Sequence, residues 1–309
     1  MGEFQKWPSI DNSYQEKNIS RWIEREPGLF HCDYEITSKL DGSNISFYFN
    51  KKEMKVFSRN NRIGDGDSFF GVWDVIKGRE YVDFFNYLKN VMIGDIQSIQ
   101  VYGEIVGPGI QKRINYGDKK FIRFFGICIN DILQSPYVSR EFIPEELYVP
   151  IMGIAKGLTE ALAWNENFVE PLSVNGDISE GIVIKPYNKV YISPVDEIFL
   201  LKKKTKEFTE KMGKKIKVDG TMHPMESWRV EFLNYITENR VLSVFSKEGE
   251  IKSPTEIGKY ISWVSLDAQK DFLKDYESEE TLQNLDKKDA KYIFNSAGSK
   301  VNKILQKYL

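Results

Sequence analysis

The apolar residues of this chain change their spacing near residue 222, and this change limits the folds open to it. Before that point short apolar runs alternate with more polar residues, as at Ile45, Phe47 and Phe49. A period of two is the pattern of a half-buried strand. After it, apolar residues recur every three or four positions, the pattern of an amphipathic helix. The sequence therefore predicts a strand-rich domain over residues 1–222 and a helical domain over residues 223–309.

Turn-forming residues divide both regions into individual elements. Strands are expected at residues 30–36, 45–50, 54–57, 99–106, 121–129, 148–152, 181–185 and 198–202, and helices at 69–76, 81–91 and 158–164. In the second region Ser253, Pro254 and Glu256 mark a helix start, with serine as the cap. Residues 293–305 predict one final amphipathic helix. A chain of 309 residues is long enough to bury a sizeable core.

The composition argues against several classes of protein. Apolar residues make up 41% and charged residues 28% of the chain, as in soluble globular proteins, and no apolar run is long enough to predict a membrane span. The first residues lack the apolar core of a secretory signal, so we expect an intracellular, cytoplasmic protein. Two cysteines and two histidines argue against a disulfide framework or a zinc site. The net charge is −2, yet basic residues gather at 112–123 and 202–217, where they can bind phosphates.

A lysine followed by Asp-Gly stands between the first two expected strands. Lys39 is therefore expected in a tight loop, with Gly42 supplying a permissive backbone. A loop held by rigid strands is a usual place for chemistry. A surface lysine in a hairpin turn is the ordinary alternative, because Asp-Gly is a common turn. A nucleophilic lysine must be neutral, which requires its pKa to fall by about 3 units from about 10.4, through burial or nearby cations.

Candidate partners for such a lysine lie on later strands. Alternation puts Lys202 and Lys204 on one strand face, where two ammonium groups can hold a triphosphate and stabilise departing pyrophosphate. A polar strand end is the alternative. Glu180 and Glu104 are carboxylates beside this expected phosphate site, which favours Mg²⁺, although an isolated Glu104 would be an ordinary sheet-rim residue.

Two further features fit a nucleotide. Arg59 suits a contact to phosphate or ribose, with a surface arginine as the equal alternative. The adjacent pair Phe124 and Phe125 offers a flat face for a purine, and one ring of such a pair is expected in the core. The sequence leaves open which ring does which.

Taken in order, these segments resemble the motif series of the covalent nucleotidyltransferases, which include ATP-dependent RNA and DNA ligases and mRNA capping enzymes. The matching segments are Lys39-Leu40-Asp41-Gly42, Ser58-Arg59-Asn60, Val101-Tyr102-Gly103-Glu104 with Phe124, Glu180 to Lys185, and Lys202 with Lys204. A narrower resemblance is to the RNA ligase 2 family, which includes phage and trypanosome RNA-editing ligases. It rests on residues 103–112, 115–119, 235–241 and 249–251.

The resemblance implies an α+β fold, with a nucleotidyltransferase (ATP-grasp-like ligase) domain of antiparallel sheets and flanking helices before a small all-helical domain. It implies a monomeric, ATP-dependent RNA ligase that joins 3′-OH and 5′-phosphate ends, at nicks in duplex RNA, through lysyl-AMP and RNA-adenylate intermediates. Lys39 would carry the AMP and Phe124 would stack on adenine. Mg²⁺ or Mn²⁺ would bind at Glu104 and Glu180. The other residues implied in nucleotide binding and catalysis are Asn44, Arg59, Lys185, Lys202 and Lys204.

The sequence departs from the RNA ligase 2 pattern in the residues beside its motifs. Asp41 stands where phage RNA ligase 2 has His, Ser38 where Glu commonly precedes the lysine, and Phe125 where Asp commonly follows the stacking ring. Two rival functions remain. A DNA ligase or GTP-using capping enzyme would typically carry a β-rich domain in place of the helical tail. A binding module without catalysis would be free to lose the lysines and glutamates that this chain retains.

Overall fold

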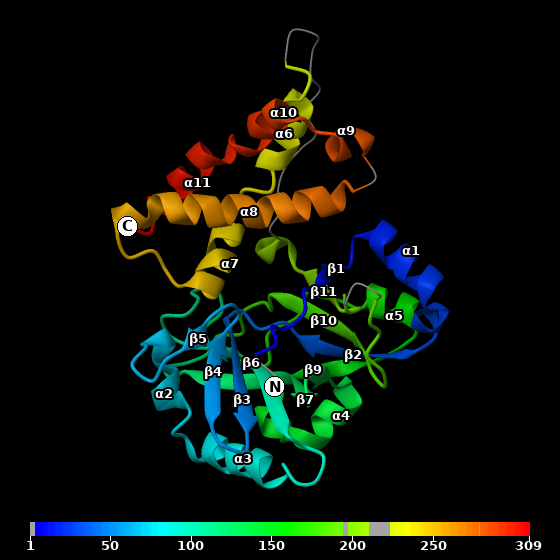
Figure 1. The fold of residues 1–309 in the computed structure, drawn as a ribbon, viewed down its shortest axis with the longest axis vertical. Coiled ribbons are helices and arrows are strands. Elements are labelled where there is room, and N and C mark those ends of the chain that lie inside the picture. Colours follow the sequence, from blue (N-terminus) through cyan, green and yellow to red (C-terminus); the bar gives the residue numbers. More distant parts are fainter. Residues whose placement is uncertain (1–3, 194–196, 210–222, 278) are drawn as a thin grey trace. The chain divides into compact units, whose positions relative to one another are not determined.

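The chain folds as two compact units, Met1–Glu207 and Phe208–Leu309. We analysed a computed structural model, which describes residues 4–193, 197–209, 223–277 and 279–309. Every strand among these residues belongs to the first unit, and the second unit is helical (Figure 1). The expected domain boundary at 222/223 falls at the edge of residues 210–222, which lie outside the described residues. The expected basic segment beyond residue 209 lies outside them too.

Five strands of the first unit form a sheet that we call the lysine sheet. Their order is β1 (Asp11–Asn12), β11 (Leu201–Lys204), β10 (Gly181–Pro186), β2 (Asp33–Ser38) and β9 (Ile151–Lys156). All neighbours are antiparallel except β1 and β11, which are parallel. One face buries Tyr34, Ile36 and Ile182 in an apolar core. Because side chains alternate along a strand, Lys202 and Lys204 lie on the opposite face.

Six strands form a second, fully antiparallel sheet, which we call the phenylalanine sheet. Their order is β5 (Arg62–Ile63), β4 (Met54–Ser58), β3 (Ser43–Asn50), β6 (Ser98–Val106), β7 (Phe121–Ile129) and β8 (Ile132–Leu133). Aromatic rings of helix α3 (Arg79–Asn90) pack on one face of this sheet, where the ring centroids of Phe47 and Phe85 lie 4.9 Å apart. That face is closed by apolar burial, so polar chemistry is left to the other face.

Short helices cover the outer surfaces of both sheets. The remaining elements of this unit are α1 (Glu16–Arg25), α2 (Val72–Val75), α4 (Pro136–Phe142), α5 (Leu158–Ala163), and the 3₁₀ turns η1 (Pro27–Phe30), η2 (Phe69–Gly71), η3 (Glu145–Leu147) and η4 (Lys206–Phe208). Helix α1 buries Ile19 and Trp22 against the apolar core of the lysine sheet. The core of each sheet thus lies on the side that its helices cover.

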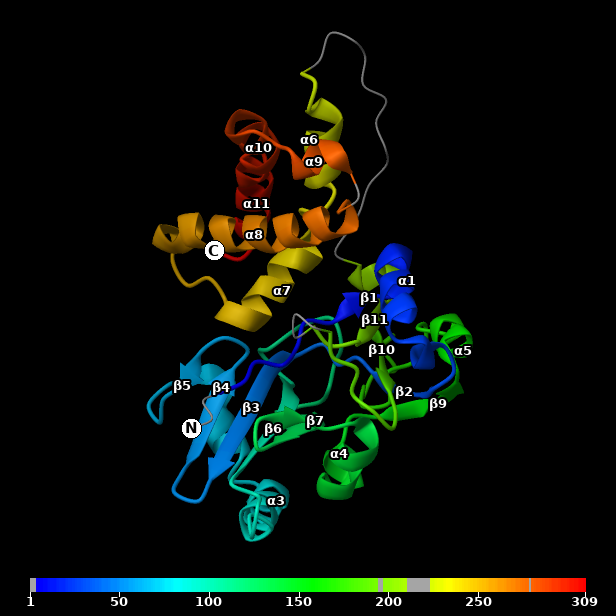
Figure 2. The same ribbon diagram turned by 45° about the vertical axis from the view of Figure 1, so that its right-hand side comes forward.

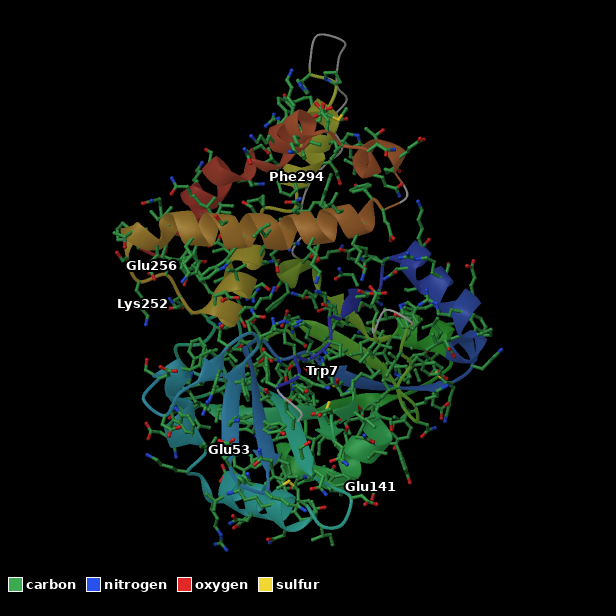
Figure 3. All side chains as sticks on the ribbon, viewed as in Figure 1. Trp7, Glu53, Glu141, Lys252, Glu256 and Phe294 are labelled. Atoms are coloured by element: carbon green, nitrogen blue, oxygen red, sulfur yellow. The ribbon has the colours of Figure 1, made fainter. Side chains whose placement is uncertain are left out.

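The segment before β1 connects the two sheets. The side chain of Gln100 on β6 bonds the backbone N–H and C=O of Gln5, at 3.1 and 3.0 Å. Trp7, labelled in Figure 3, is buried with its ring 5.1 Å from Tyr102 and 4.8 Å from Phe125. β1 then pairs with β11 in the lysine sheet. The N-terminal segment therefore packs on one sheet and adds a strand to the other.

The second unit is built around one long helix. Its elements are α6 (Glu226–Leu233), α7 (Glu238–Glu248), η5 (Pro254–Glu256), α8 (Ile257–Asp275), α9 (Glu280–Gln283), α10 (Lys287–Phe294) and α11 (Ala297–Leu305). Helices α7 and α11 both pack against α8 (Figure 2), and they also contact each other, with Glu238 of α7 pairing with Lys307 just after α11. Phe272 of α8 packs against Phe232 and against Phe294 in the core, and Phe294 is labelled in Figure 3. No helix among the described residues combines the length and apolar character needed to cross a membrane.

The predicted α+β fold class is confirmed, and most expected elements are present within a few residues. Three expectations are wrong in detail. The final helix is two helices, because α10 ends at Phe294 and α11 begins at Ala297. The helix expected at 69–76 is the turn η2 followed by α2, with Phe70 and Gly71 at positive φ between them. The strands expected at 30–36, 148–152 and 198–202 are β2, β9 and β11, and each begins three residues later than expected, at Asp33, Ile151 and Leu201.

Candidate active site

The loop that carries Lys39 crosses from one sheet to the other. β2 ends at Ser38 in the lysine sheet and β3 begins at Ser43 in the phenylalanine sheet, so the two strands do not form a hairpin. A Cβ atom on Gly42 would lie 2.4 Å from the carbonyl oxygen of Ile105 on β6. Glycine is therefore required here by close approach to β6. Gly42 is not among the positive-φ residues, so glycine serves close approach here and not a left-handed backbone.

One carboxylate bridges two lysines at the centre of the site. Lys39 Nζ lies 2.8 Å from Glu180 Oε2, and Lys204 Nζ lies 2.9 Å from Glu180 Oε1. The Glu180 side chain is 4% exposed and that of Lys39 is 22% exposed, so the pair is largely removed from water. Burial alone would raise the pKa of Glu180, but Lys204 and Lys39 more than offset it and lower this pKa to about 2. Glu180 is thus a carboxylate at neutral pH.

Neighbouring strands bring these groups together. Gly181 on β10 pairs with Lys204 on β11, which places Glu180 beside the end of β11. A Cβ atom on Gly181 would lie 2.0 Å from the carbonyl oxygen of Lys203, and its φ of 145° also favours glycine. Lys202 lies on the same strand face as Lys204 and pairs with Val183. The lysine sheet therefore contributes one carboxylate and two ammonium groups.

Glu104 faces this cluster from the phenylalanine sheet. Glu104 lies on β6, directly opposite Asn44 on the adjacent strand β3, so the two side chains are on the same face of the sheet. The pKa of Glu104 is raised to about 8. Burial is the main cause, and the positive charge of Lys39 offsets only part of the rise. Glu180 adds to the rise, whereas Arg59 is near enough to lower it. The predicted residues Lys39, Asn44, Arg59, Glu104, Glu180, Lys202 and Lys204 are thus carried on the loop and strand segments that meet around the Lys39–Glu180 pair.

A divalent cation fits at Glu104. Among the described residues, none donates a hydrogen bond to the Glu104 carboxylate or forms an ion pair with it. An ionised carboxylate in such a low-dielectric site is costly unless a cation neutralises it. Both oxygens of Glu180 already bond lysines, so Glu104 is the carboxylate open to a cation. Within the described ranges no group of three or more acidic, thiol or imidazole side chains forms a full cage, so water would complete the coordination.

Arg113 holds Asp41 of the Lys39 loop. Its Nε donates to Asp41 Oδ2 at 3.0 Å, and a second guanidinium nitrogen donates to Asp41 Oδ1. The N–H of Asp41 donates to the Tyr116 hydroxyl at 3.0 Å. Burial and Glu180 raise the pKa of Asp41, and Arg113 opposes them. Sequence reasoning missed Arg113 and Tyr116, although the basic pair at 112–113 and the run at 115–119 were the signals that pointed to this segment.

The side chains of Phe124 and Phe125 lie in different environments. Phe124 is fully buried, and its ring contacts Phe47, Tyr81, Phe84 and Phe85 at centroid distances of 5.2–6.4 Å. A ring enclosed in this way has no face for adenine, so the expectation that Phe124 stacks on the base does not agree with the structure. Phe125 is half-buried and borders a small pocket, together with Trp7 and Lys185. Phe125 is the ring of the pair with an accessible face.

Lys185 is not brought to the other predicted residues. Its Nζ lies 2.8 Å from Glu35 Oε1, and it donates to the Tyr148 hydroxyl and the carbonyl oxygen of Phe125, both at 3.2 Å. An ammonium group has three donors, and all are engaged here. Its strand position is four residues from Gly181, about 13 Å along β10. The expected phosphate contact of Lys185 is therefore not supported, and its partners Glu35 and Tyr148 had no sequence signal.

Comparison with known proteins agrees with this geometry. A family model described as RNA ligase matches residues 33–204, which is more than half of the chain and includes the whole Lys39–Glu180–Lys204 cluster. The chain belongs to the RNA ligase family. A second model, described as T4 RNA ligase 2 C-terminal, matches residues 226–303 of the helical unit. The predicted resemblance to the RNA ligase 2 family is therefore confirmed over both parts of the chain.

Solved structures of an RNA ligase from Naegleria gruberi share the fold. A variant with ATP and Mn is 17% identical, covers 67% of this chain and 59% of its own, and superposes with a TM-score of 0.50. The structure with PPi is 18% identical, with the same coverages and the same TM-score. At this identity the similarity concerns the fold alone. This RNA ligase family member spans about three fifths of the length of those chains.

Proposed function

We propose that this chain is an ATP-dependent RNA ligase that joins 3′-OH and 5′-phosphate ends at nicks in duplex RNA, as a cytoplasmic monomer. The observation that carries the proposal is the Lys39 amine, held 2.8 Å from Glu180 in a loop between two sheets, with Lys204 on the other oxygen of the same carboxylate. Membership of the RNA ligase family supports the reaction class. The helical C-terminal region supports an RNA ligase 2 type of enzyme over DNA ligases and capping enzymes.

The first step would load AMP on Lys39. Lys39 first releases one ammonium proton to solvent, and the neutral amine then attacks the α-phosphorus of ATP. A P–N bond forms, the bond to pyrophosphate breaks, and the nitrogen bonded to phosphorus releases a second proton to solvent. Lys202 and Lys204 share one strand face and would neutralise charge on the departing pyrophosphate. Phe125, with its accessible ring, is the residue we propose for stacking on adenine, while Asn44 and Arg59 would contact the ribose and phosphates.

Two later steps would use the same groups. A 5′-phosphate oxygen of RNA attacks the AMP phosphorus, so that the P–N bond breaks and an RNA-adenylate forms. A 3′-hydroxyl then attacks the 5′-phosphorus, the phosphodiester forms, and AMP leaves with the electron pair of the anhydride bond. Mg²⁺ or Mn²⁺ held at Glu104 would neutralise charge at phosphorus. Glu180 would keep Lys39 and Lys204 in place between steps.

The test is covalent labelling of the purified chain by ATP labelled in the α-phosphate, with Mg²⁺. We expect a mass increase of one AMP that pyrophosphate removes, and no labelling of Lys39→Ala. Lys77→Ala is the control, because Lys77 is 74% exposed and forms its ion pair with nearby Asp74. Equal labelling of Lys39→Ala would refute the assignment. Preference for GTP, or sealing of DNA nicks but not RNA nicks, would refute the substrate part alone.

A further inference from the structure

We propose that Arg113 is a positioning residue for the Lys39 nucleophile, and that it acts through Asp41. Its guanidinium makes two hydrogen bonds to a carboxylate that is only 3% exposed and lies two residues after Lys39. Such a two-point contact fixes orientation as well as distance. The consequence for catalysis rests on the proposed function, whereas the structural contact does not.

The segment that carries Arg113 is itself anchored. The N–H of Asn115 donates to Asp177 Oδ2 at 2.7 Å, and its carbonyl oxygen accepts from the N–H of Val174 at 2.9 Å. Tyr116, the next residue, binds the Asp41 amide. Residues 113–116 therefore connect the Lys39 loop to a second loop, which contains Val174 and Asp177. Movement of residues 113–116 would move Asp41, and with it the backbone of Lys39.

Charge explains why the contact has to be made by arginine. Asp41, Glu104 and Glu180 place three carboxylates near one another, and their charges raise each other's energy. Without Arg113, the buried Asp41 carboxylate would lose its charge-assisted hydrogen bonds and would move towards water or take up a proton. Lysine would supply a charge but not the planar pair of donors.

The experiment measures adenylation in variants of this contact. We would determine the single-turnover rate of adduct formation at saturating ATP and the ATP concentration for half-maximal rate. Arg113→Met should lower the rate about 100-fold with a smaller change in half-saturation, because misplacing a reacting group by about 1 Å costs a factor of this size. Arg113→Lys should recover less than a tenth of the loss. Sealing of an RNA nick that already carries AMP should fall by less than about tenfold, since Lys39 does not attack in that step.

A double-mutant cycle tests whether Arg113 acts through Asp41. In the Asp41→Asn background, Arg113→Met should cause no further loss beyond about twofold. Lys156→Met is the matched control. Lys156 forms an exposed ion pair with Asp33, which begins β2, whereas the Lys39 loop follows the other end of that strand. This variant should adenylate at the wild-type rate. A further loss of tenfold or more in the Asp41→Asn background would overturn the proposal, as would an Arg113→Met rate equal to wild type.

Amide hydrogen exchange separates this inference from the proposed function. Arg113→Met should speed exchange of the Asp41 amide, which donates to Tyr116, with β3 amides unchanged. If the wild-type chain forms no AMP adduct, the proposed function fails, and this exchange result alone decides the positioning role. If Arg113→Met does not fold, the same measurement on Arg113→Lys decides it. Unchanged exchange at Asp41 in a folded variant would overturn the inference.

Discussion

Glu104 should make the first unit less stable as pH rises, and Glu104→Gln should remove that effect. Burial raises the pKa of Glu104 to about 8, compared with about 4.3 in an unfolded chain. Between these values the folded protein keeps a proton that the unfolded chain has released. Because the unfolded state then binds fewer protons, the free energy of unfolding falls with increasing pH across this window. Below about pH 4 the penalty is absent, since both states hold the proton.

The size of the effect follows from linkage. One proton difference changes the free energy of unfolding by about 1.4 kcal/mol per pH unit, so the loss between pH 5.5 and 7.5 is about 3 kcal/mol. Glutamine has no proton to release. The difference in unfolding free energy between Glu104→Gln and wild type should therefore shift by about 3 kcal/mol in favour of the variant over this range. Contributions from other titrating groups that the substitution does not alter cancel in the difference.

The assay is denaturant unfolding of both proteins at pH 5.5, 6.5 and 7.5 in the presence of a chelator. Glu53→Gln is the control, because Glu53 is an exposed carboxylate (labelled in Figure 3) whose pKa is lowered by Lys55, so it stays ionised throughout. Its difference from wild type should not change with pH. Adding Mn²⁺ should flatten the wild-type slope if the cation replaces the proton at Glu104. A pH-independent difference between wild type and Glu104→Gln would refute the reasoning.

Three further predictions follow, two from side-chain packing and one from buried ion pairs. Gly42→Ala should lower the adenylation rate at least about 100-fold in a folded protein, because its Cβ would meet the Ile105 carbonyl oxygen; near-normal labelling would contradict this. Phe124→Ala should cost about 3–5 kcal/mol of unfolding free energy, whereas Phe125→Ala should chiefly raise the ATP concentration for half-maximal labelling about tenfold, by loss of stacking; the reverse pattern would restore Phe124 as the stacking ring. Arg240→Met should destabilise the helical unit by about 3 kcal/mol, since it removes the buried guanidinium that pairs with Asp267 and Asp271 of α8, although Asp267 keeps its ion pair with Lys247, and calorimetry would measure it.

Residues at strand ends were the predictable part of the site. Lys39 follows β2, Glu180 precedes β10 and Lys204 ends β11, so strand periodicity and motif order were enough to place them together. Each of these strands is bounded by glycine or by charged residues that sequence patterns mark clearly. The same reasoning located the strand-rich and helical regions, because amphipathic spacing in the last third differs from alternation before it.

Details that depend on pairing between distant strands could not be predicted. On β6, Tyr102 pairs with Gly126 and Gly103 pairs with Phe124, so Phe125 is an extra residue on β7. A bulge of this kind re-aims side chains, and it decides which phenylalanine enters the core. Lys185 likewise has the right motif position, but pairing of β10 with β2 sets it directly opposite Glu35. No local pattern near either residue reports its partner in the other strand.

The balance of charge explains how a slightly acidic chain could present the proposed phosphate site. The whole chain carries a net charge of −2, yet the five cations Lys39, Arg59, Arg113, Lys202 and Lys204 outnumber the four carboxylates of the site, Asp41, Glu104, Glu170 and Glu180. A local positive excess attracts a polyphosphate whatever the net charge. Glu180 bonds both Lys39 and Lys204. A triphosphate that bonds Lys204 must compete with Glu180 for it, so nucleotide binding and rearrangement of the Lys39–Glu180 pair are coupled.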